Sequence, residues 1–131
     1  MKRAYDRAFD PPAPIVAVRV RAPGADDGVS VNGKLDTGAD LCAVPSHVIE
    51  ELDLPPGRVV RAAGFAGDLH EVVVYRLDLE IGDLAFSAVE ALATRRAYVI
   101  VGRSVLRELV LRLDGPKAQL ELRRPRARQR R

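Results

Sequence analysis

A chain of 131 residues, 47% of them apolar, can bury the core of one domain, and it has no stretch near the roughly 18 apolar residues that a membrane-spanning helix needs. We therefore expect one soluble domain. Cys42 is the only cysteine, which excludes an intrachain disulfide and a cysteine-rich metal site and suits a reducing compartment. A secretory signal has an apolar stretch after its positively charged start, and the N-terminus of this chain has none. We therefore expect a cytoplasmic protein.

The net charge of +3 is unevenly distributed along the chain. Six of the 21 Lys and Arg residues fall within residues 123–131, and the remaining chain is acidic, with 15 basic and 18 acidic residues. Like charges repel and this segment has little to bury, so we predict a disordered, solubilising tail. Binding of the tail to nucleic acid or another anionic surface stays open as an alternative, although it contains no aromatic residue that could stack on bases.

Apolar residues at every second position predict the first strands. Residues 16–20 and 29–31 alternate in this way, and the loop at 22–28 separates them, so the pattern indicates a hairpin. The Asn-Gly pair at 32–33 predicts a second tight turn or a bulge.

A buried strand and a short helix are predicted next. The continuous apolar run at 41–44 is typical of a strand covered on both faces, and the helix that follows from Ser46 should bury Val48, Ile49 and Leu52. Two further strands are then expected, joined by a small glycine-bearing tip, and they occupy residues 58–63 and 69–75.

The rest of the chain continues the strand pattern. Residues 77–81 and 84–92 read as two more strands, Ser104 can cap a second short helix, and residues 109–122 form a terminal hairpin. This hairpin either completes the domain's own sheet or pairs with a second chain, because open strand edges tend to find partners. Seven or more short strands with two short helices favour an all-β barrel or sandwich.

The tripeptide Asp36-Thr37-Gly38 carries the chemical information of the chain. It follows an apolar strand, and about sixty residues later an apolar run at 98–101 precedes Gly102. No second Asp-Thr-Gly or Asp-Ser-Gly occurs in the sequence. A reaction that needs two facing carboxylates of this kind therefore requires two chains.

In order and spacing, residues 35–40, the hairpin tip at 64–67 and residues 100–106 resemble the retropepsins, the retroviral-type aspartic proteases, and their bacterial and cellular relatives. The resemblance covers roughly residues 14–113. It implies a closed, barrel-like all-β fold with one lobe per chain and a homodimer that hydrolyses peptide bonds.

The resemblance implies a role for each residue of these motifs. The catalytic residues would be Asp36, Thr37 and Gly38. Substrate binding would fall to Ala39, Asp40, Gly64, Phe65 and Ala66, and structural support of the site to Gly102 and Arg103. Two aspartates about 4 Å apart in a medium of effective dielectric about 20 repel by about 4 kcal/mol, or about 3 pK units, so the pair holds one proton and can activate a water.

Within these roles, Thr37 would cross-link the two catalytic loops and an ion pair between Asp40 and Arg103 would fix each loop. The tip at 64–67 would be the flap that closes over the substrate, with an ordinary hairpin as the alternative. An apolar substrate cleft would be lined by Val44, Phe65 and Val99.

We therefore predict a homodimeric aspartic endopeptidase that acts on peptide or protein substrates without cofactor or metal. Its domain would span residues 14–122, after an N-terminal extension at 1–13 and before the basic tail at 123–131. The two histidines and Cys42 have no zinc-site spacing. The alternative is a catalytically silent dimerisation or peptide-binding module with the same fold.

Overall fold

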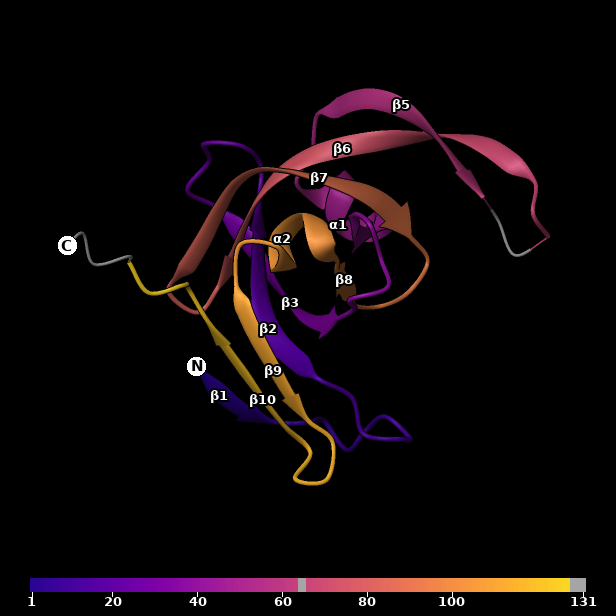
Figure 1. Ribbon diagram of the computed structural model, residues 1–131. Helices are drawn as coiled ribbons and strands as arrows, with labels where there is room; N and C mark the ends of the chain where they lie inside the picture. Colours follow the sequence, from indigo (N-terminus) through magenta and orange to yellow (C-terminus); the bar gives the residue numbers. More distant parts are fainter. Residues whose placement is uncertain (64–65, 128–131) are drawn as a thin grey trace.

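The computed structural model describes residues 1–63 and 66–127, which contain ten strands and two short helices (Figure 1). The strands are β1 (Lys2–Ala4), β2 (Ile15–Arg21), β3 (Gly28–Leu35), β4 (Cys42–Pro45), β5 (Pro56–Ala63), β6 (Leu69–Ile81), β7 (Leu84–Thr94), β8 (Val99–Val101), β9 (Val110–Asp114) and β10 (Gln119–Arg123). The helices are α1 (Ser46–Glu51) and α2 (Arg103–Leu106). Neither helix is long and apolar enough to cross a bilayer, and no other helix occurs in the described part of the chain.

Six strands close into a barrel. They pair in the order β2-β3-β8-β4-β7-β6, and β6 pairs again with β2, so the sheet returns to its first strand. Strand β5 pairs only with β6, and the two form a long ribbon that reaches beyond the barrel (Figure 1). The prediction of an all-β, barrel-like fold with two short helices is confirmed.

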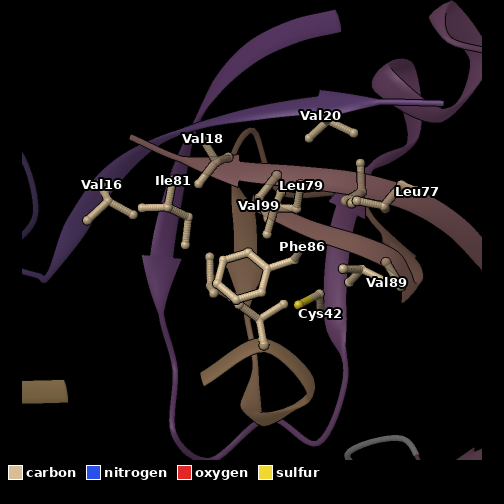
Figure 2. Close-up of a cluster of buried hydrophobic side chains, with 14 of the residues drawn as sticks. Val16, Val18, Val20, Cys42, Leu77, Leu79, Ile81, Phe86, Val89 and Val99 are labelled. Atoms are coloured by element: carbon tan, nitrogen blue, oxygen red, sulfur yellow. The ribbon is translucent and has the colours of Figure 1, made fainter. Parts of the chain in front are cut away.

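Alternating residues fill the barrel. Val16, Val18 and Val20 of β2 point inward, each at most 3% exposed, and meet the equally buried Leu79 and Ile81 of β6 (Figure 2). Burying each such side chain contributes about 1.5–3 kcal/mol relative to leaving it in water. The residues between them on β2 face outward, so the period of two in the sequence sorts the strand into a core face and an outer face.

The tight turn or bulge predicted at Asn32-Gly33 is wrong, because both residues lie inside β3 and pair with β2 in continuous register. Gly33 marks a close approach instead. A Cβ at Gly33 would lie 2.8 Å from Cγ1 of Val18 and 3.1 Å from Cγ2 of Val101. Glycine is therefore needed there for the packing of β3 against its neighbours rather than for a change of direction.

The two helices are short and differ in detail from the prediction. Helix α1 buries Val48 and Ile49, whereas Leu52 follows its last turn and is half-buried. Ser104 is not the N-cap of α2, because that helix begins at Arg103 and its N-cap residue is Gly102. The Ser104 hydroxyl instead lies 3.5 Å from Sγ of Cys42.

The two ends of the described chain form a separate three-stranded sheet in the order β1-β10-β9 (Figure 1). The N-terminal ammonium of Met1 donates a hydrogen bond of 2.8 Å to the carbonyl oxygen of Leu122. Leu120 and Leu122 of β10 are at most 1% exposed and belong to the main core. The terminal hairpin thus pairs within its own chain, but with the N-terminal strand rather than with the barrel.

Candidate active site

Asp36 follows directly after β3, where that strand runs parallel to β8. Its backbone N–H donates to the carbonyl oxygen of Val101 over 3.0 Å, which joins the start of the loop to β8. Its carboxylate oxygen Oδ1 accepts the N–H of Gly38 at 2.9 Å, and its carbonyl accepts the N–H of Ala39 at 3.3 Å. The half-exposed carboxylate is therefore held by a tight turn of its own loop.

The backbone of α2 fixes the other end of this loop. The N–H of Arg103 donates to the carbonyl of Ala39 at 2.8 Å, and the N–H of Ser104 donates to the carbonyl of Asp40 at 3.1 Å. Gly102 lies against the same stretch, because a Cβ there would collide with the carbonyl of Leu41 and lie 2.9 Å from that of Ala39. The absence of a side chain at Gly102 lets the two backbones meet.

The side chain of Arg103 adds a third connection. One guanidinium nitrogen donates to the carbonyl oxygen of Thr37 at 2.9 Å, and another forms an ion pair with the carboxylate of Asp40. Both side chains are largely exposed. Arg103 thus reaches both sides of the loop that begins with Asp36.

The remaining loop residues lie at the surface of the single chain. Thr37 and Gly38 are exposed and Ala39 is half-buried. The Thr37 hydroxyl has no hydrogen-bond partner among residues 1–63 and 66–127. The loop therefore presents a carboxylate and a free hydroxyl outward.

A cleft of about 780 Å³ separates this loop from the β5–β6 ribbon. Asp36, Gly38 and Ala39 lie on one side of it, and Val60 and Ala62 of β5 on the other. Ala66, expected at the flap tip, is exposed in the turn and is not among the lining residues. Gly64 and Phe65 lie outside the described residues.

The expected apolar lining by Val44 and Val99 is wrong. They are 1% and 0% exposed and point into the barrel core. Because side chains alternate along a strand, their neighbours Ala43 and Ile100 face the cleft instead. Three arginines, Arg58, Arg61 and Arg96, also line it, and the sequence interpretation missed all three. Alternation along β4 and β8 could have identified Ala43 and Ile100, because each lies between two residues that point into the core.

Cys42 follows the loop that begins with Asp36, lies in the core and is 1% exposed. Burial raises the pKa of its thiol, against weaker opposing hydrogen bonds from Ser104 and Gly102. It is therefore a packing residue without a charged form at neutral pH. In the described part of the chain, no three His, Cys, Asp or Glu side chains gather into a group that could hold a metal ion.

Residues 18–114, well over half of the chain, match the family described as aspartyl protease. The chain belongs to this family. The match includes the loop at Asp36, the β5–β6 ribbon and the Gly102-Arg103 segment. No curated protein matches the chain.

Solved structures place this member of the aspartyl protease family among the retropepsin-like folds. A retropepsin-like aspartic protease from Rickettsia conorii has a TM-score of 0.63 at 17% identity, covering 92% of this chain and 86% of that one. EIAV protease complexed with the inhibitor HBY-793 has a TM-score of 0.53 at 20% identity, covering 72% and 86%. The foamy viral protease-reverse transcriptase has a TM-score of 0.57 at 20% identity over 72% of this chain, which spans only 12% of that longer protein. The predicted resemblance to retropepsins is confirmed at the level of family and fold.

Proposed function

We propose that this aspartyl protease family member is an endopeptidase whose active site forms between two copies of the chain. The observation that carries the proposal is the position of Asp36, half-exposed at the side of a large cleft on a loop tied to β8 and α2. The other loop carboxylate, Asp40, is paired with Arg103. Each chain thus supplies one free carboxylate, and a second copy supplies the other.

In the proposed dimer the two Asp36 carboxylates share one proton, because two negative charges at close range do not ionise together. The ionised carboxylate takes a proton from a water molecule, and the oxygen of that water attacks the peptide carbonyl carbon. The protonated carboxylate donates its proton to the carbonyl oxygen. Collapse of the tetrahedral intermediate then breaks the C–N bond: the leaving amine takes a proton from the protonated carboxyl, and the ionised carboxylate takes one proton back from a hydroxyl of the intermediate.

The neighbouring residues support this chemistry in the proposal. The exposed Thr37 hydroxyl would bond to the loop of the partner chain, and the Gly38 N–H already holds one oxygen of Asp36. Ala39 and Asp40 would line the path of the substrate. Gly64, Phe65 and Ala66, which follow β5 in the sequence, would close over the substrate as a flap.

Cleavage of a peptide library between acidic and neutral pH tests the proposal, with wild type and Asp36→Asn compared at several protein concentrations. We expect activity per chain to rise with the fraction of dimer measured by sedimentation, and Asp36→Asn to abolish it. Because the Asp36 side chain is half-exposed, the variant should unfold at nearly the wild-type temperature.

Two results would contradict the proposal. Equal cleavage by both proteins would indicate a contaminating protease. A proven dimer that cleaves nothing would favour the silent dimerisation or peptide-binding module.

A further inference from the structure

Arg96 is a charged residue of the cleft that the proposed mechanism does not use. It lies exposed in the connection between β7 and β8 and lines the cleft together with Asp36 and Ile100. Its guanidinium has no carboxylate partner among residues 1–63 and 66–127. It is therefore a cation available to a ligand in the cleft.

Two contacts orient the Arg96 side chain. Its backbone N–H donates to the hydroxyl of Thr94 at 3.2 Å, which fixes the bend of the loop. Its guanidinium donates to the hydroxyl of Tyr98 at 3.0 Å and lies 5.8 Å from the centre of that ring. Tyr98 is in turn packed edge-on against Phe9, with ring centres 5.5 Å apart. The arginine is thus held in place before any ligand arrives.

Two other charged groups of the cleft, Arg58 and Asp40, are paired within the chain. Arg58 forms an ion pair of 2.6 Å with Glu90, and Asp40 is paired with Arg103. Arg61 also lines the cleft and stands across from Glu71 in the β5–β6 pairing, but it forms no ion pair among residues 1–63 and 66–127. Among the described residues, the charged groups of the cleft without an ion pair are thus Asp36, Arg61 and Arg96, and of the two arginines Arg96 is held by the Tyr98 hydroxyl.

We propose that Arg96 is a specificity-determining residue that binds the carboxylate of an acidic substrate side chain close to the scissile bond. This inference rests on the proposed protease function. The planar guanidinium matches a carboxylate in two parallel hydrogen bonds, and the bond to Tyr98 uses only one of its donors. The substrates are then peptides with Glu or Asp beside an apolar scissile pair, because Ala43 and Ile100 supply an apolar wall.

Matched peptides test the inference. They share one apolar scissile pair and differ by Glu, Gln or Lys at one flanking position at a time. We expect kcat/KM for the best Glu peptide to exceed that of its Gln counterpart about tenfold, and the Lys peptide to be the poorest. In Arg96→Gln the Glu/Gln ratio should fall to about one, because kcat/KM for the Glu peptide falls by more than that for the Gln peptide. Added salt should lower the wild-type ratio because it screens exposed charges.

Two variants serve as comparisons. Arg95→Gln removes the same charge from the adjacent exposed residue, which does not line the cleft, and should keep the wild-type ratio. Tyr98→Phe keeps the ring but removes the hydroxyl that orients Arg96, and should lower the ratio partway. A general structural loss would instead reduce cleavage of all peptides equally.

An unchanged Glu/Gln ratio in an active Arg96→Gln enzyme overturns the inference and leaves the protease proposal intact. If no peptide is cleaved in an Asp36-dependent manner, the protease proposal fails. In that case the charge preference is tested by measuring the affinity of the same peptides, labelled with fluorescein. The two proteins compared are Asp36→Asn and the double variant that carries both Asp36→Asn and Arg96→Gln. Equal affinity for the Glu and Gln peptides overturns the inference in that case.

Discussion

Arg103 forms an ion pair with Asp40 across 63 positions of sequence, and the same guanidinium donates to the carbonyl of Thr37. A planar side chain with several donors can make both contacts at once, whereas a lysine ammonium on its flexible stem cannot replace this geometry. The pair is also largely exposed, and exposed ion pairs contribute only about 0–1 kcal/mol to folding. Its contribution is therefore to hold the shape of the loop rather than to stabilise the fold.

The first prediction concerns Arg103→Lys. We expect the free energy of unfolding to fall by less than about 1 kcal/mol, and kcat/KM to fall on the order of 10–100-fold because Asp36 is misplaced. Urea unfolding and peptide cleavage measure the two quantities. Arg107→Lys, at an exposed residue just after the same helix, should change neither. A large loss of stability with unchanged cleavage would contradict the assignment.

Gly102→Ala provides the second prediction, because the new Cβ would meet backbone that cannot swing away. It would collide with the carbonyl of Leu41, whose carbon lies 2.7 Å from the Cβ position. We expect a loss of about 1–3 kcal/mol in unfolding free energy, typical of overpacking, and a loss of cleavage that exceeds the loss of folded protein. Gly115→Ala is the matched control, since a Cβ there meets nothing within 4 Å. Equal effects of the two substitutions on stability and cleavage would show that the close contact does not matter.

The loop that begins with Asp36 could be recognised from the sequence as the candidate site because its signal is local. Asp36, Thr37 and Gly38 are adjacent, and the apolar-Gly-Arg segment that supports them has its own recognisable spacing. Most strands could also be predicted from the sequence, since alternation of apolar and polar residues follows directly from strand geometry. The chain 69–81, expected as two segments, is one strand, β6.

What the sequence did not reveal depends on which residues meet in space. Gly33 suggests a turn until Val18 and Val101 are known to pack against it. Likewise, nothing local to Lys2–Ala4 indicates that it pairs with β10. Arg96 resembles an ordinary surface arginine until the cleft is traced. These are long-range relationships, set by the closure of the barrel and not by any neighbouring residue.

Cys42 supports a third prediction. Only the thiolate reacts with alkylating agents, and each unit by which a pKa rises lowers the thiolate fraction about tenfold. Since burial both raises the pKa of Cys42 and blocks access, iodoacetamide should modify it far more slowly in the native protein than in urea. Ser87→Cys adds an exposed thiol on β7 as an internal reference, and mass spectrometry separates the two. Equal native rates at both positions would mean that the core around Cys42 opens readily.

Asp78 leads to a prediction about pH. Its side chain is buried, with 9% of the residue exposed, and its two carboxylate oxygens accept the N–H of Gly24 at 2.9 Å and of Ala88 at 3.1 Å. The bond from Gly24 contributes most to lowering the pKa of Asp78 below its ordinary value of 3.8, with help from Ala88 and Arg21, while burial opposes the shift. The ionised carboxylate thus connects β6 to the β2–β3 loop and to β7.

Because the folded protein holds this proton less tightly than the unfolded chain, Asp78 stabilises the fold fully above its ordinary pKa, and the contribution is lost as the pH falls below about 4. Asp78→Asn leaves an amide nitrogen facing a backbone N–H, so we expect it to cost about 1–3 kcal/mol at neutral pH. The difference between wild type and variant should shrink when urea unfolding is repeated near pH 3. Asp83→Asn, at an exposed residue in the β6–β7 turn, should show no such loss. If the Asp78→Asn difference is the same at both pH values, the buried carboxylate is not what joins these three segments.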